Sequence, residues 1–108
     1  MQEGLYKALF QTQQGAGAGV VYLSEGTVRG GDSGMFYVGT YTLDGDQFTA
    51  TVKVDTHTDT PGLLSTLGRD SATLVLAGSF NGDTVITKGT TPDVPGLTFQ
   101  AILSRLSD

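Results

Sequence analysis

Few side chains of this chain could do acid–base or metal chemistry. It has one histidine, His57, and no cysteine, so disulfides, thiolate ligands and a cysteine nucleophile are excluded. A lone histidine has no second imidazole or thiolate with which to complete a zinc site, and sequence spacing supplies no serine partner for a triad. The sequence therefore predicts no catalytic residue, no metal site and no cofactor.

The carboxylates are spread along the chain rather than paired. Most lie at the expected ends of strands and in turns: Asp44, Asp46, Asp55, Asp59, Asp70 and Asp83. Aspartate favours such places because its side chain bonds to nearby main-chain groups. Asp44-Gly45-Asp46 resembles part of a calcium loop, but the remaining ligands and the closing glutamate are missing. We expect structural roles for these side chains and a protein that is not an enzyme.

The charge balance bears on partners and location. Eleven acidic residues against six basic ones give a net charge of −5. Phosphate binding needs clustered lysine and arginine, whereas the bases here are scattered singly, so we expect neither nucleic acid nor a membrane as a partner. No signal peptide and no apolar run of transmembrane length is seen. The sequence thus predicts a cytoplasmic protein.

Residues 30–55 give the clearest structural signal. Apolar and polar side chains alternate over residues 47–54, the period of a half-buried strand. Residues 35–41 alternate in the same way, with Tyr37 on the inner face. Between them we predict a two-residue Asp44-Gly45 hairpin turn, because both central positions accept a positive φ.

The same pattern extends over the whole chain. About eight strands are expected, separated by glycine-rich turns. Consecutive hairpins favour an all-β, antiparallel, up-and-down barrel as a single domain over residues 1–108, because closure removes exposed edges; a two-sheet sandwich is the alternative. Residues 15–19 (GAGAG) are predicted to be a hairpin loop. Leucines at helical spacing predict one short helical turn near residues 62–68.

The interior of such a barrel holds its own side chains or a small ligand. The residues expected to line it are Tyr37, Phe48, Val52, Leu74, Leu76 and Phe99. Core packing is the simpler purpose for these residues. The alternative is a binding site for a small apolar ligand, which would make the protein a carrier or sensor.

The outward faces are less polar than a monomer needs. Five apolar residues fall opposite the inferred core faces: Val75, Ala77, Ile86, Ile102 and Leu106. Burial between two copies of the chain would explain them. We therefore expect a homodimer.

Three short motifs resemble the GrlR-like family: Gly4-Leu5-Tyr6, Gly30-Gly31-Asp32 and Tyr37-Val38-Gly39. The similarity in strand order covers nearly the whole chain. That family takes its name from a negative regulator of bacterial type III secretion genes. The resemblance implies a small lipocalin-like β-barrel, dimeric in the named protein, that binds a helix-turn-helix transcriptional activator rather than DNA.

The resemblance also implies a contact site. In the named regulator an exposed Glu-Asp-Glu-Asp run follows the Tyr-x-Gly strand and mediates activator binding. The matching positions here are residues 43–46, of which Asp44 and Asp46 agree and Gly45 lies between them. The expected function is regulation through protein contact at Asp44, Gly45 and Asp46.

Overall fold

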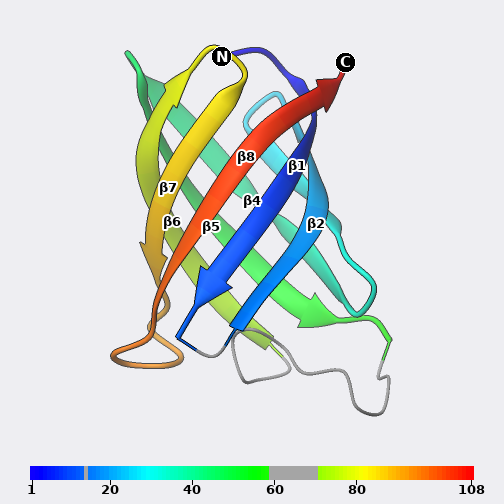
Figure 1. Cartoon of the computed structure of the whole chain (residues 1–108), viewed down its shortest axis with the longest axis vertical. Coiled ribbons are helices and arrows are strands. Elements are labelled where there is room, and N and C mark those ends of the chain that lie inside the picture. Colours follow the sequence, from blue (N-terminus) through cyan, green and yellow to red (C-terminus); the bar gives the residue numbers. More distant parts are fainter. Residues whose placement is uncertain (14, 59–70) are drawn as a thin grey trace.

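The computed structural model describes residues 1–13, 15–58 and 71–108. These form eight strands: β1 (Gly4–Thr12), β2 (Gly15–Ser24), β3 (Thr27–Gly31), β4 (Met35–Asp44), β5 (Gln47–Thr56), β6 (Ser71–Asn81), β7 (Thr84–Thr90) and β8 (Thr98–Ser107). Each strand pairs antiparallel with the next, and β8 pairs with β1, so the sheet closes (Figure 1). The predicted all-β up-and-down barrel is confirmed. The helical turn predicted near 62–68 lies outside the described residues.

Alternation along the strands separates the core from the surface. In β5, Phe48, Ala50, Val52 and Val54 are buried, while the residues between them are exposed. The inward side chains of the eight strands form one hydrophobic core. The six residues predicted to line the interior belong to this core, as a barrel with period-two strands requires.

Residues 15–19 differ from the prediction, because they begin β2 instead of forming a loop. They pair with β1 as far as Gly19, which lies opposite Ala8. A Cβ at Gly19 would lie 2.8 Å from the Tyr37 hydroxyl. Glycine is common in turns, but here the space taken by an aromatic side chain inside the barrel explains a small residue within a strand.

Two inward glycines allow neighbouring strands to approach closely. A Cβ at Gly30 would lie 2.0 Å from the Val20 carbonyl oxygen, and one at Gly78 would lie 1.9 Å from that of Ile86. Gly30 pairs with Tyr37 in the neighbouring strand, and Gly78 pairs with Phe48. Aromatic residues opposite glycines are a known device for stabilising the sharp coiling that closes a small barrel.

The barrel is flattened, with extents of 39 × 28 × 19 Å. Figure 1 looks down the shortest axis, so β7, β8, β1 and β2 form the near broad face, with β4 and β5 behind them. Each broad face is therefore a wide outer surface whose side chains point away from the core.

Candidate functional site

The turn between β4 and β5 is the predicted contact site. Asp44 pairs with Gln47 as the last rung of the ladder, so the turn residues are Gly45 and Asp46. Gly45 has φ +62°, whereas Asp46 is not among the residues with positive φ, which is the pattern of a type II′ turn. The turn thus lies one residue later than predicted. A glycine at the first turn position explains the shift, because this turn type needs a positive φ only there.

The tip of this hairpin is open to solvent. Residues 43–47 are all exposed, and the side chain of Leu43 is 43% exposed. Phe80 of β6 donates its main-chain N–H to the Asp46 carbonyl oxygen at 2.9 Å. The tip therefore presents two carboxylates and one apolar side chain on a firmly held backbone.

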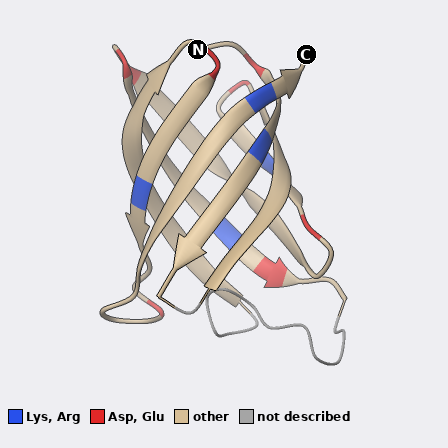
Figure 2. Ribbon diagram, in the orientation of Figure 1, with Lys and Arg blue, Asp and Glu red and all other residues tan. Residues whose placement is uncertain are grey.

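Other acidic side chains lie at the same end of the barrel. The N-terminal segment, the C-terminus and the turns β2–β3, β4–β5 and β6–β7 meet there, and they carry Glu3, Glu25, Asp44, Asp46, Asp83 and Asp108. Figure 2 shows acidic residues at the end that holds both termini and others toward the opposite end, with basic residues on the strands. Arg105 lies at this acidic end, where its Nη2 is 2.7 Å from Asp108 Oδ1. The acidic end is a surface that favours a basic partner.

The predicted ligand-lining residues all lie in the barrel interior. Tyr37, Phe48, Val52, Leu74, Leu76 and Phe99 are between 1% and 9% exposed. They belong to the single core cluster, and the ring of Phe48 stacks on that of Tyr41 with centroids 5.6 Å apart. The sequence placed them correctly on the inner faces. Their arrangement is that of side chains packing against one another.

Asp32 of the Gly-Gly-Asp motif holds the β3–β4 turn through three hydrogen bonds, which we call the Asp32 lock. The Asp32 carboxylate accepts N–H bonds from Gly34 at 2.9 Å and Met35 at 2.8 Å, and also accepts the Tyr37 hydroxyl proton. Burial raises the pKa of Tyr37, and the hydrogen bond to Asp32 raises it further. The hydroxyl is therefore a stable donor. The residues that carry the family resemblance hold one corner of the barrel together.

His57 lies beside this lock but does not reach its carboxylate. Its Nε2 is 2.9 Å from the Asp32 main-chain oxygen, and its Nδ1 is 2.6 Å from the Thr58 hydroxyl. A histidine general base needs an orienting carboxylate and a nucleophile within hydrogen-bond reach; here its ring is bound to main chain and to the next residue. Over residues 1–13, 15–58 and 71–108, no group of three metal-ligating side chains comes together.

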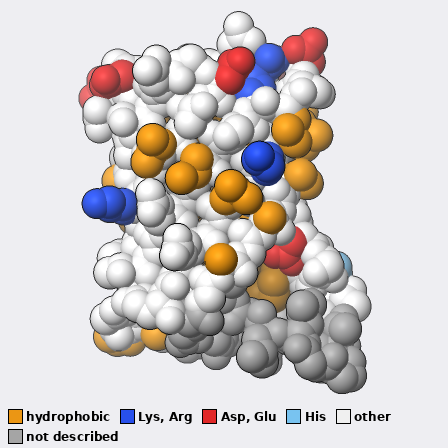
Figure 3. All heavy atoms as spheres, in the orientation of Figure 1, with side chains coloured by type: hydrophobic (Ala, Val, Ile, Leu, Met, Phe, Trp, Pro, Cys, Tyr) orange, Lys and Arg blue, Asp and Glu red, His pale blue; other side chains and the backbone are white. Residues whose placement is uncertain are grey.

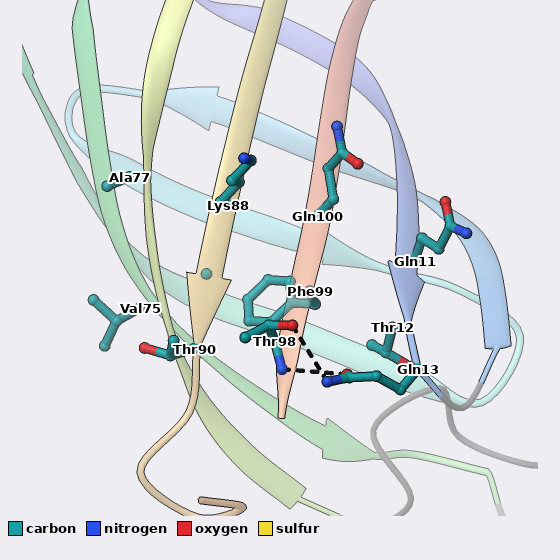
Figure 4. A pocket seen from close by; sticks show the side chains of 11 residues that line it. Gln11, Thr12, Gln13, Val75, Ala77, Lys88, Thr90, Thr98, Phe99 and Gln100 are labelled. Carbon is teal, nitrogen blue, oxygen red and sulfur yellow. Dashed lines mark hydrogen bonds between the residues drawn. The ribbon is translucent and has the colours of Figure 1, made fainter. Parts of the chain in front are cut away.

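A groove of about 740 Å³, which the sequence did not predict, crosses the outer wall over β6, β7, β8 and β1 (Figure 4). Its lining is mostly amides, hydroxyls and short apolar side chains: Gln11, Thr12, Gln13, Val75, Ala77, Lys88, Gly89, Thr90, Thr98, Phe99 and Gln100. Gln13 bridges to β8, since its Oε1 accepts the Thr98 N–H at 3.2 Å and its Nε2 lies 3.3 Å from the Thr98 hydroxyl. Gln11 lies on the outer face of β1, and Gln13 follows the end of that strand.

Beside this groove the near broad face is apolar. We call apolar face the outward side chains of Leu9, Val20, Tyr22, Ile86, Ile102 and Leu106. Ile86 pairs with Ile102, and Ile102 pairs with Leu9, so these three form one continuous row across β7, β8 and β1. Figure 3 shows hydrophobic side chains gathered in a band over this face. The predicted outward direction of Ile86, Ile102 and Leu106 is confirmed.

No protein-family model matches the chain, and a search of curated proteins finds no relative. Among the described residues there is no helix long and apolar enough to span a membrane. The barrel and the geometry of its surfaces are therefore the ground for any functional proposal.

Proposed function

We propose that this protein is a non-enzymatic regulator that acts by binding another protein, in the manner of GrlR-like proteins, and that it works as a cytoplasmic homodimer. The observation that carries the proposal is the exposed Leu43–Gln47 tip at the acidic end. Asp44 precedes a tight turn and Asp46 lies in it, and the turn backbone is bonded to β6. A preorganised tip loses little conformational freedom on binding, so more of its contact energy remains as affinity.

The charge of this end gives the chemistry of the partner. Four described carboxylates surround the two of the tip, and Arg105 is engaged by Asp108. A partner with a basic surface would be steered towards this end and away from like charge. A DNA-binding activator has such a surface, and the family resemblance implies that kind of partner. Negative regulation would then follow from occupying the activator's basic face.

The experiment is affinity capture from the source cells with the wild-type protein and with an Asp44→Ala/Asp46→Ala variant. We expect the wild type to capture a DNA-binding protein and the double variant to lose it. The comparison variant is Asp83→Ala, which removes a carboxylate of the acidic end outside the tip and should lower capture far less than the double variant. Gly82-Asp83 is the same kind of two-residue turn at the same end, with Gly82 at φ +62°. Equal capture by all three proteins would contradict the tip as the contact.

The same sample tests the carrier alternative. Native mass spectra of freshly purified protein would show a small apolar ligand as added mass. The interior side chains already pack together, so we expect a ligand-free mass. A stoichiometric small molecule released only on unfolding would replace the regulator proposal with a carrier.

A further inference from the structure

We infer that the apolar face is the dimer interface, and that two copies join there end for end about a two-fold axis along the row Ile86–Ile102–Leu9. The inference rests on the homodimer in the proposed function and names its surface and symmetry. Three features of the face carry it: its composition, its charge and its area.

The row consists of apolar side chains exposed on the outer surface, as expected of a surface that a partner buries. Ile86 is 51% exposed and Leu9 is 43% exposed, and Ile102 lies between them in register. Val20 and Tyr22 on β2 are also 41% and 44% exposed, but Val20 pairs with Lys7 and Tyr22 pairs with Arg29. The continuous apolar set is therefore the row itself. Single exposed apolar side chains are ordinary, but a contiguous set marks an interaction site.

Exposure of an apolar side chain does not by itself mark an interface, as Val38 on the opposite broad face shows. Val38 of β4 is 45% exposed, but its register partners are Arg29 on β3 and Lys53 on β5. Long basic side chains can lay their methylene groups over such a neighbour. Across the sheet Val38 lies between two basic residues, with Phe36 as its exposed apolar neighbour along β4. The row on β7, β8 and β1 differs because it is apolar across three paired strands.

The charged residues beside the row favour a second copy of the chain as the partner, in one orientation. The row is bordered by Lys7 on one side and Lys88 on the other. With a two-fold axis along the row, each row residue faces the same residue of the second copy. The residue two positions before it then faces the residue two positions after it in the copy. Lys7 therefore faces the copy's Gln11, and Lys88 faces the copy's Thr84. No like charges are brought together, and each ammonium meets a neutral acceptor.

The same axis separates the acidic ends. Turning the copies end for end places the end with six described carboxylates beside the opposite end of the second barrel, which carries only three described carboxylates: Asp32, Asp55 and Asp93. Two barrels joined side by side in the same direction would bring both acidic ends together, which costs Coulomb energy. The charge pattern therefore favours the end-for-end arrangement.

The broad face that carries the row is large enough for an interface between two copies. The molecule is 28 Å across in its middle dimension, and a square of that width covers roughly 800 Å², which is what one partner contributes to a standard stable interface. The other broad surface, over β4 and β5, exposes threonines together with Phe36 and Val38. The near face differs in carrying an apolar row that crosses three paired strands.

The test is sedimentation equilibrium of the full chain, of Ile102→Glu, and of the control Val38→Glu on the opposite face. We expect twice the chain mass for the wild type and the control, and a dissociation constant raised roughly a hundredfold or more by Ile102→Glu, which buries two carboxylates in the contact. A monomeric wild type, or equal dissociation constants for the wild type and Ile102→Glu, would overturn the interface. Circular dichroism checks that each variant folds.

A second measurement keeps the symmetry falsifiable even if Ile102→Glu fails to fold. The chain has no cysteine, so Leu9→Cys introduces a single thiol. End-for-end joining places Leu9 against its own copy, and we expect rapid disulfide-linked dimers on mild oxidation. Cross-linking of Leu9→Cys to Ile86→Cys, with no Leu9→Cys homodimer, would instead show barrels joined in the same direction. Neither result depends on Asp44 or Asp46, so loss of the protein partner and loss of the dimer are separable.

Discussion

The two broad faces of the barrel are built on the same kind of strand but expose different chemistry. On the near face, Ile86, Ile102 and Leu9 form an apolar row. On the far face, β4 and β5 expose two paired sets of threonines, Thr40 opposite Thr51 and Thr42 opposite Thr49. We call these four side chains the threonine face.

The difference separates what folding requires from what association requires. Threonine and isoleucine are both β-branched and both suit a pleated strand. Threonine also satisfies itself on the surface, since the hydroxyls of Thr42 and Thr49 are 2.6 Å apart. A strand can therefore form with hydroxyls facing water. The apolar row is not needed to make strands, and this supports a role in contact.

The largest effect should come from making the two faces alike. Thr40→Ile/Thr51→Ile would place a second apolar patch opposite the first. Because a patch on each face can bind a further copy without closing a ring, we expect species larger than the dimer and loss of solubility. Light scattering after gel filtration measures the mass. The control is Thr40→Ser/Thr51→Ser, and a double isoleucine variant with the wild-type mass would contradict the comparison.

A smaller effect should come from giving the apolar row the chemistry of the far face. Ile86→Thr removes about 1 kcal/mol of apolar burial from each copy. Two copies make about 2 kcal/mol, so we expect the dimer dissociation constant to rise roughly thirtyfold. Val38→Thr, a matched change on β4, should alter it less than about twofold. Equal shifts for both variants, measured by dilution in a sedimentation experiment, would remove the distinction between the faces.

The interior lies behind both faces and should respond to pH independently of association. Burial and the bond to Asp32 raise the pKa of Tyr37 above its usual 10.0. The unfolded chain ionises first, so the stabilising contribution is complete below pH 10 and falls as the pH rises above it, by at most about 1.4 kcal/mol per pH unit. Urea unfolding at pH 8 and pH 11 measures this.

Two variants sharpen that prediction. Tyr37→Phe should show a smaller loss between the two pH values, while burial also raises the pKa of Tyr6 and Tyr41, so some dependence remains. Ile102→Glu should lose as much stability as the wild type, because the barrel interior is unchanged in the monomer. The same loss in the wild type and Tyr37→Phe would show that the Asp32 lock does not hold the phenol neutral.

The smallest effect belongs to the threonine face itself. Thr49→Val removes the hydroxyl bond to Thr42 but leaves an exposed β-branched residue, so we expect the free energy of unfolding to change by less than about 1 kcal/mol. The dimer mass should not change. A shift in dissociation constant for this variant would mean that the far face also takes part in association.

Period-two alternation predicted the strands and the inner faces, because a half-buried strand must alternate whatever its neighbours are. This alternation did not predict the strand at residues 15–19. Their glycines are typical of a loop, and the reason why Gly19 must be small is seen only in the fold, where the Gly31 main-chain oxygen and the Tyr37 side chain lie against it. The turn at Gly45-Asp46 was shifted by one residue because its type depends on strand register, which the sequence does not state.

The candidate surfaces could likewise be predicted only in part from the sequence. Ile86, Ile102 and Leu106 were recognisable as outward apolar residues from alternation alone. The alignment of Ile86 and Ile102 with Leu9 needed the pairing of β8 with β1, since β1 is far from β7 and β8 in the sequence. The groove over β6, β7, β8 and β1 likewise joins distant segments, and only closure between β1 and β8 brings them together.

The most direct test of the account is a native mass spectrum of freshly purified wild-type protein, recorded beside that of Ile102→Glu. The account predicts a ligand-free dimer for the wild type and a ligand-free monomer for the variant. A wild-type monomer would contradict the claim that the apolar face is covered by a second copy, and a dimer in both samples would place the contact elsewhere on the barrel.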